Sequence, residues 1–334
     1  MLKYILKRLF ISIFVLLGVS IIIYTLVRMM PNDYLDIKFA SQLGQTMTQE
    51  QLQEFKDQYG IGDNSFKGLV SGYFNWLGNM LQGNLGRSFK YEKPVAQVIG
   101  ENMWVSFAIA VIATTLQFAI AIPLGVSSAT HQYSKRDYAV TIFTMIGISL
   151  PTYFFAAIII KIFSVELGWF PSTGLISATK VYPNTFVGFI SKTLDIIHHL
   201  VLPITCTVIL SLGGLMRYTR TNTLEVLSAD YIRTARAKGL DEKQVIYKHA
   251  FRNTMIPLVT LLAGILPSLF GGMMITEEVF AIDGIGRLAY NALSQGDIPF
   301  VMGYNMFLAV LTVIGTLFSD IMYSVVDPRV KLGK

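Results

Sequence analysis

The sequence predicts an all-α membrane protein with six transmembrane helices, and its composition is the first observation that indicates this class. Of the 334 residues, 53% are hydrophobic and only 14% are charged. This is far more apolar surface than one soluble core of this size requires. In addition, six uncharged stretches approach the roughly 20 residues that a helix needs to cross a hydrocarbon core of about 30 Å.

Polar segments separate the six predicted spans. The first span follows Lys3, Lys7 and Arg8, as the apolar part of a secretory signal would. Its apolar run exceeds the roughly 7 to 15 residues of a signal sequence, so we expect a retained helix. The fourth span is the shortest, and we expect its helix to begin near Ile196. The spans comprise residues 9–27, 104–126, 138–160, 200–216, 254–276 and 300–319.

The spans divide the chain into four predicted parts. Residues 1–30 form a transmembrane helix, and residues 31–102 form an extracytoplasmic loop region with short helices. Residues 103–326 form the membrane core, and residues 327–334 form a cytoplasmic tail.

Two short helices are predicted in the loop region. The first begins with the capping box of Thr48 and Gln51 and ends at Gly60. The second covers residues 66–81 and has an aromatic-rich apolar side. Because so much apolar surface is seldom left exposed, packing against the spans is favoured over lying on the membrane surface. That side contains Leu69, Val70, Tyr73, Trp76, Leu77 and Leu81.

Basic residues indicate the orientation of the chain. If the N-terminus is cytoplasmic, the inner segments hold more than half of the 27 lysines and arginines. The long outer loop after the first span translocates regardless of its charge. Both termini are therefore predicted to be cytoplasmic. The net charge of +6 suits anionic lipid headgroups on that side, so nucleic acid is not needed to explain it.

Few residues suggest chemistry on this chain. Cys206 is the one cysteine, so neither an internal disulfide nor a cysteine metal site is expected. No phosphate-binding G-x-x-x-x-G-K-[ST] loop occurs, and Gly284-Ile-Gly286-Arg-Leu-Ala289 is assigned to an outer turn because it follows a span and not a strand. We expect no catalytic residue, metal or cofactor. Ionisable residues are sparse in the spans, which disfavours an ion-coupled carrier.

A short basic segment between the fourth and fifth spans is the most informative feature. Ser228 is expected to cap a helix of about ten residues, roughly 15 Å long, that Gly239 ends in a left-handed turn. Asp241 with Gln244 is expected to cap a second helix that leads into the fifth span. The predicted docking residues are Asp230, Tyr231, Arg233, Thr234, Ala235, Arg236, Ala237, Lys238, Gly239 and Leu240.

The composition of this segment favours docking to a cytosolic partner. Its alanines, Ala229, Ala235 and Ala237, are expected to keep the helix thin enough to enter a groove. Its basic side chains either orient the helix against acidic groups or lie at the lipid surface.

The same segment, followed by His249-Ala-Phe-Arg-Asn253, resembles the coupling loop of ABC-importer permeases of the oligopeptide and dipeptide branch (OppB/DppB type). The general importer signature has a glutamate where this chain has Arg233, a departure that is typical of the peptide branch. Other motifs of the family occur along the whole chain, in the same order as in the family. They are Trp76-Leu-Gly, Gly83-Asn-Leu-Gly-Arg-Ser88, Ile122-Pro-Leu-Gly125, Ser149-Leu-Pro-Thr-Tyr-Phe154, Leu167-Gly-Trp-Phe-Pro171, Glu278-Val-Phe280 with Gly284-x-Gly286, and Asp327-Pro-Arg329.

The resemblance implies a type I ABC importer permease fold with an additional N-terminal span and a coupling loop over residues 217–253. It implies a multi-pass protein of the bacterial cell membrane that forms half of a peptide pathway in contact with lipid. The implied partners are a homologous second permease (OppC/DppC type), two cytosolic ATPase subunits that bind ATP and Mg²⁺, and an extracytoplasmic peptide-binding protein. The alternatives are a nickel or glutathione permease, a secondary carrier and a membrane anchor.

Small polar residues in the spans are candidates for lining the pathway, because a conduit needs weak binding to release its cargo. The alternative is that these hydroxyls satisfy backbone carbonyls within helices that proline and glycine interrupt. The candidates are Ser149, Thr152, Thr205, Thr207 and Ser211.

Overall fold

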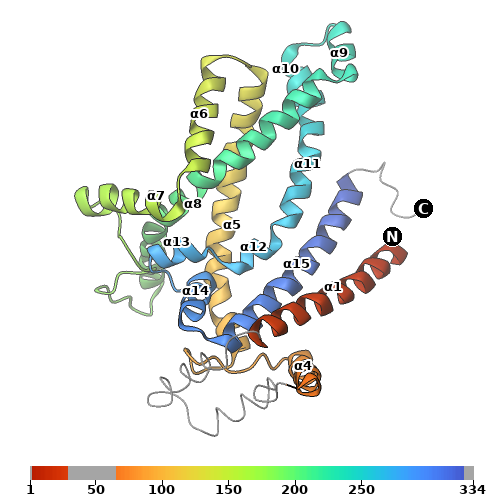
Figure 1. The fold of residues 1–334 in the computed structure, drawn as a ribbon. Helices are drawn as coiled ribbons and strands as arrows, with labels where there is room; N and C mark the ends of the chain where they lie inside the picture. The colour runs from red at the N-terminus through yellow and green to blue at the C-terminus, as the bar shows by residue number, and fades with distance from the viewer. Residues whose placement is uncertain (1, 29–64, 327–334) are drawn as a thin grey trace. The chain divides into compact units, whose positions relative to one another are not determined.

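The computed structural model describes residues 2–28 and 65–326 and shows helices joined by turns (Figure 1). Within these residues the sole β contact is an isolated bridge between Arg87 and Pro94, which confirms the all-α class. The predicted helix over residues 48–60 and the predicted tail 327–334 lie outside the described residues. The chain divides into two compact units. One contains residues up to Trp104 with residues 288–317, and the other contains residues 105–287 with the segment from residue 318.

The first unit is built on α1 (Leu2–Arg28), α4 (Phe66–Leu81) and the first part of α15 (Ile298–Val326). Trp76 is 3% exposed and packs with Tyr24 and Met302. The predicted helix over residues 66–81 is therefore confirmed, and so is its packing against a span. Its buried side differs from the prediction, because Gly68 and Gly72 are buried whereas Leu69, Val70 and Leu81 are exposed.

In the first unit, a buried carboxylate joins the segment after α4 to the start of α15. Asp297 accepts hydrogen bonds from the Ser88 hydroxyl and from the backbone amides of Lys90 (3.1 Å) and Phe300 (3.2 Å). These bonds fix the segment after α4 against α15. Since the carboxylate is 1% exposed, it needs these donors to offset the loss of water.

The second unit contains a sharply bent span. It begins with the rest of α5 (Val95–Thr130), followed by α6 (Lys135–Ser149) and α7 (Thr152–Ile159), which a π-helix continues over Ile160–Glu166. The two halves of the predicted third span make an angle of 106°. Leu150 and Pro151 are both extended at the bend, because a residue before proline is driven out of the helical region. The predicted third span is therefore two helices joined at a sharp bend, and not one continuous helix.

The predicted fifth span is also divided. It comprises α11 (Phe251–Gly264), α12 (Leu266–Gly271) and α13 (Met274–Val279). The chain turns at Gly272, whose φ is +75°, a conformation that glycine adopts without steric cost. A Cβ there would lie 2.4 Å from the Gly286 amide nitrogen. This close backbone approach explains why the apolar stretch does not continue as one helix.

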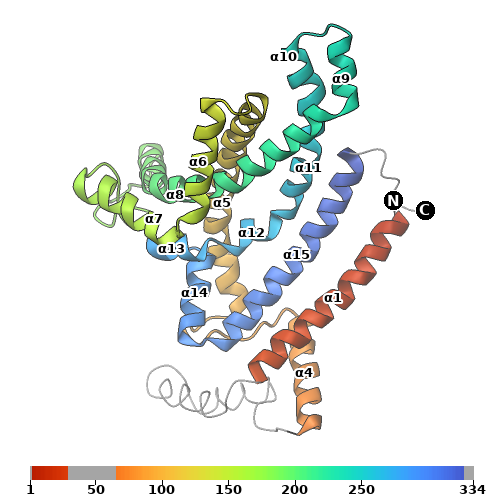
Figure 2. The ribbon, with the colours of Figure 1, turned by 45° about the horizontal axis from the view of Figure 1, so that its top comes forward.

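The other four predicted spans each lie within one helix. Four described helices are long and apolar enough to cross a membrane, and the bent pair raises this number to five. The fourth span belongs to α8 (Phe186–Ser228), which begins well before the expected Ile196. In both views α9 (Asp230–Ala237) lies at one end of α8, far from α7 (Figures 1 and 2).

Glycines let the helices of the second unit approach closely. A Cβ on Gly213 of α8 would lie 2.7 Å from the Thr144 carbonyl oxygen of α6, and one on Gly147 would lie 3.1 Å from the Ile209 carbonyl oxygen. A Cβ on Gly125 of α5 would lie 2.7 Å from the Thr219 Cβ. Helices α5, α6 and α8 therefore form a tightly packed group.

Candidate docking helix and candidate pathway

The predicted docking segment forms a short helix that directly follows α8. Ala229 is extended, with φ −70° and ψ 148°, and α9 begins at the next residue. At the other end, Gly239 has φ +76°. Its amide donates to the Arg236 carbonyl (2.9 Å), and the Leu240 amide donates to the Ala235 carbonyl (3.4 Å). These two bonds define a Schellman motif, which confirms the predicted left-handed glycine stop.

The predicted N-terminal cap is wrong. Ser228 is the last residue of α8, and its hydroxyl donates to the Glu225 carbonyl (2.7 Å). Ala229 therefore occupies the cap position, without a side-chain hydrogen bond. Residues 217–228, the first part of the predicted coupling loop, belong to α8. The next helix, α9, has eight residues, about 12 Å at 1.5 Å per residue, and is shorter than expected.

One side of α9 packs on the segment that follows it. Ile232 and Ala235 form a buried cluster with Val245 and Ala250. Ala235 therefore faces inward and does not thin the exposed surface of α9. The remaining predicted docking residues are exposed. The small cluster holds α9 in a fixed orientation and leaves its polar side accessible.

Ion pairs organise part of the exposed side. Arg236 makes two hydrogen bonds with the carboxylate of Glu242, at 2.7 and 3.1 Å. These bonds hold the pKa of Glu242 below its ordinary value of 4.5. Arg233 lies 3.7 Å from Asp230. Because both pairs are largely exposed, each contributes at most about 1 kcal/mol, so they orient side chains more than they stabilise the fold.

The predicted second helix is also present. The Asp241 carboxylate accepts a hydrogen bond from the Lys243 amide (3.1 Å) and caps α10 (Glu242–Gln244). A π-helix over Val245–Ala250 then joins α10 to α11 without an intervening loop. A displacement of α9 therefore reaches a membrane helix through the short turn 238–241 and, from Glu242 onward, through continuous helical backbone.

The predicted pathway residues gather near the bend between α6 and α7. Ser149 ends α6 and is exposed, and Thr152 begins α7. The Cys206 thiol lies 4.0 Å from the Thr152 carbonyl oxygen, so the bend packs against α8. The other candidates, Thr205, Thr207 and Ser211, lie on α8 and are partly buried.

Two of these hydroxyls satisfy backbone carbonyls, as the alternative interpretation expects. Thr207 donates to the Pro203 carbonyl (3.0 Å), and Ser211 donates to the Val208 carbonyl (3.1 Å). Such bonds do not prevent the residues from facing a pathway. The lining role therefore stays a prediction.

A buried glutamate that the sequence analysis missed organises the turn before α14 (Ile285–Gln295). Glu277 is fully buried and accepts hydrogen bonds from the Ser106 hydroxyl (2.7 Å) and from the amides of Met273 (2.9 Å) and Arg287 (3.0 Å). A Cβ on Gly284 would lie within 2.4 Å of this carboxylate. The glycines of the G-x-G-x-x-A pattern thus make room for a carboxylate of the chain itself. The predicted turn is wrong beyond Gly284, because residues 285–289 belong to α14.

A second missed residue fixes the loop before α8. The buried Asp195 carboxylate accepts hydrogen bonds from the Ser177 amide (2.7 Å), the Lys180 ammonium (2.7 Å) and the Tyr182 hydroxyl (2.7 Å). The hydrogen bond to Asp195 raises the pKa of Lys180. Asp195 was not singled out because it precedes the predicted fourth span, in a polar stretch whose sequence does not reveal the partners of an acid.

The long apolar helices and their close glycine contacts define a multi-pass membrane protein. Residues 121–332 match the family described as binding-protein-dependent transport system inner membrane component. Residues 1–110 match the corresponding N-terminal family. The chain belongs to this family of transport-system membrane components.

Named relatives cover the chain over its whole length. It is 37% identical to the oligopeptide transport system permease protein AppB of Bacillus subtilis, over 99% of this chain and 100% of that one. It is 31% identical to the dipeptide transport system permease protein DppB of Alkalihalophilus pseudofirmus, over 99% and 100%. These matches confirm the resemblance inferred from the motifs.

One solved structure supports the fold. It is the MetNI methionine ABC transporter in inward-facing conformations, with a TM-score of 0.50 and 18% identity. The match covers 69% of this chain and 97% of that one. At this identity the likeness shows the permease fold alone.

Proposed function

We propose that this chain is a permease subunit of an ATP-driven ABC importer for oligopeptides or dipeptides and forms half of its translocation pathway. One observation carries this proposal: the full-length match to the oligopeptide permease AppB, at 37% identity. Because the match includes the N-terminal region, the added span and the outer loop belong to the same kind of protein. The dipeptide permease DppB supports the same cargo class.

The docking helix supports coupling to ATPase subunits. Residues 230–240 form a compact, mostly exposed and basic element, held in place by its own small core. The chain carries no phosphate-binding loop, so ATP and Mg²⁺ are assigned to two cytosolic partner subunits. Their acidic surface groups are the expected contacts of the basic side chains on α9.

The proposed assembly also contains a homologous second permease and an extracytoplasmic peptide-binding protein. The concentration of lysine and arginine in the inner segments supports cytoplasmic positions for both termini. Contact with membrane lipid is supported by α1, on which large apolar side chains such as Leu9, Phe10 and Phe14 are exposed.

Reconstitution tests this function. The chain is co-expressed with the second permease and the ATPase subunits of its own organism, purified and placed in liposomes. The binding protein is added outside with the peptide that mass spectrometry finds bound to it. We expect peptide accumulation that requires ATP on the cytosolic side, with a non-hydrolysable ATP analogue as the negative control.

Other outcomes would contradict the proposal in distinct ways. Uptake driven by an ion gradient without ATP indicates a secondary carrier. A binding protein that carries nickel or glutathione and no peptide indicates another cargo of the same family. If no ATPase subunit co-purifies with the chain, it acts as an anchor or scaffold.

A further inference from the structure

The cytosolic end of α8 is tied to the turn between α5 and α6 by a charged contact. Arg220 of α8 donates from Nε to Oδ1 of Asp137 (2.8 Å) and from a terminal nitrogen to Oδ2 (3.0 Å). The same Nε lies 3.1 Å from the Ser128 hydroxyl of α5. A two-point bond between guanidinium and carboxylate fixes both distance and orientation. We call Arg220, Asp137 and Ser128 the Arg220 clamp.

Both oxygens of the Asp137 carboxylate in this clamp accept hydrogen bonds. Asp137 is 4% exposed and also accepts hydrogen bonds from the Ser128 hydroxyl and from the Tyr133 amide (3.0 Å). Tyr133 has φ +63°, a conformation that side-chain-bearing residues adopt at a cost. Asp137 thus holds a strained turn in shape and joins that turn to α8.

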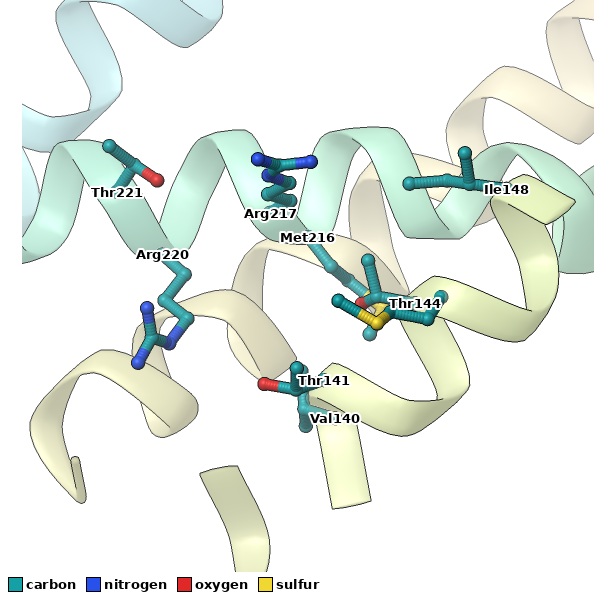
Figure 3. A pocket seen from close by; sticks show the side chains of 9 residues that line it. Val140, Thr141, Thr144, Ile148, Met216, Arg217, Arg220 and Thr221 are labelled. Atoms are coloured by element: carbon teal, nitrogen blue, oxygen red, sulfur yellow. The ribbon is translucent and has the colours of Figure 1, made fainter. Parts of the chain in front are cut away.

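The clamp is separated from the close contact between α6 and α8. The glycine contacts at Gly147 and Gly213 join the two helices through their backbones. Between that contact and Arg220 lies a cavity of about 300 Å³ whose lining residues all come from α6 and α8. Figure 3 shows Thr141, Thr144 and Met216 in this region, with Arg220 and Arg217 leaving α8 on opposite sides.

This arrangement determines how motion is passed between the helices. Where side chains do not fill the space between two helices, dispersion contacts are lost and packing transmits less force. On the side of α8 that faces α6, the clamp is therefore the stiff connection near this end, whereas α5 also approaches α8 closely at Gly125 and Thr219. Only Ala229 separates α8 from α9, so a displacement of α9 reaches Arg220 through helical backbone about two turns long.

We propose that the Arg220 clamp positions the α5–α6 turn so that it moves with the docking helix and carries ATPase-driven motion to the bend between α6 and α7. This inference rests on the proposed function as an ABC permease. Arg220 and Asp137 are positioning residues, and neither needs to touch the cargo. Without the clamp, α9 still binds the ATPases, but its motion is no longer passed to α6.

The test compares Arg220→Gln and Arg220→Lys with a matched control in the reconstituted importer. The control is Arg136→Gln, which removes the same charge from an exposed residue beside Asp137. We expect Arg220→Gln to keep ATPase association and to hydrolyse ATP within about twofold of wild type. The amount of peptide transported per ATP should fall about tenfold or more. Arg220→Lys should give a partial loss, because it keeps the charge and loses the two-point geometry. Arg136→Gln should match wild type.

A covalent replacement provides the second measurement. In a Cys206→Ser background, the double variant Asp137→Cys/Arg220→Cys should be uncoupled, and a short bis-maleimide bridge should restore coupling. The proposal is overturned if the bridged protein stays uncoupled, if Arg220→Gln transports the wild-type amount per ATP, or if Arg136→Gln is equally impaired. Loss of assembly in all Arg220 variants also overturns it, because the pair then serves folding alone. If wild type itself shows no ATP-dependent uptake, it is the proposed function that fails.

Discussion

Gly239 offers the clearest single test of the docking helix. The residue has φ +76°, and no atom lies within 4 Å of the position that a Cβ would take. A side chain there therefore causes no steric clash, and its cost is conformational. Placing an L-residue in the left-handed region costs roughly 1 to 2 kcal/mol. Aspartate adds about 0.3 to 1 kcal/mol, because its charge stands at the negative end of the helix dipole.

These terms give a graded series of variants. Gly239→Asp should disfavour the native turn by roughly 2 kcal/mol, or about thirtyfold, and peptide uptake should fail. Peptide uptake should fall about tenfold for Gly239→Ala, which carries the conformational cost alone. Gly239→Asn should be less impaired than Gly239→Asp, because both residues tolerate the left-handed region alike and asparagine adds no charge at the helix end. The global fold should survive, since stabilities of roughly 5 to 15 kcal/mol exceed the penalty. Gly78→Ala is the control, because Gly78 lies inside α4 and a Cβ there also meets nothing.

The assays are membrane abundance, ATPase co-purification, peptide-stimulated ATP hydrolysis and uptake. Gly239→Asp should reach the membrane at normal abundance and lose stimulated hydrolysis and uptake together. Normal ATPase association with normal stimulated hydrolysis would refute the coupling role. An asparagine variant as damaged as the aspartate variant would show that the charge at the helix end is not the cause.

Two further predictions address orientation and the buried glutamate. In a Cys206→Ser background, an impermeant thiol reagent on intact cells should label Val181→Cys, which is highly exposed, and spare Lys243→Cys; the reverse pattern would contradict cytoplasmic termini. Glu277→Gln should lower the free energy of unfolding by about 1 to 3 kcal/mol. The carboxylate accepts hydrogen bonds from backbone amides with both oxygens, whereas glutamine places an NH₂ donor opposite one of these amides. Thermal unfolding in detergent measures this effect against the partly exposed Glu278→Gln, and equal midpoints would show that the buried carboxylate is not required.

The spans were predictable because uncharged length is a property of the sequence alone. The breaks within the third and fifth spans were less predictable from the sequence. Pro151 is visible in the sequence, but a proline in a membrane helix is compatible with a slight kink as well as with a complete turn. The bend of 106° also depends on α7 packing against α8 and α13, which only the tertiary structure supplies. Likewise, Gly272 interrupts the fifth span because Gly286 approaches it closely.

The docking segment shows the same division between local and tertiary information. Gly239 was predictable because a glycine after a helical pattern favours a left-handed stop. Ser228 was misassigned because α8 continues through residues that looked like loop, so its hydroxyl serves the end of α8. Ala235 faces inward because α9 packs on Val245 and Ala250. Glu277 directly follows an apolar stretch, but its amide partners come from segments that the sequence does not place beside it.

The length of α8 gives the docking helix leverage. Its 43 residues correspond to about 65 Å at 1.5 Å per residue, roughly twice the thickness of a hydrocarbon core. The uncharged stretch 200–216 accounts for about 26 Å, which leaves an arm of about 18 Å over residues 217–228 beyond the predicted span. A tilt of about 10° around the inner membrane boundary then sweeps α9 sideways by about 3 Å, more than half of a helical pitch. Small angular changes of α8 are thus converted into ångström-scale displacements of α9.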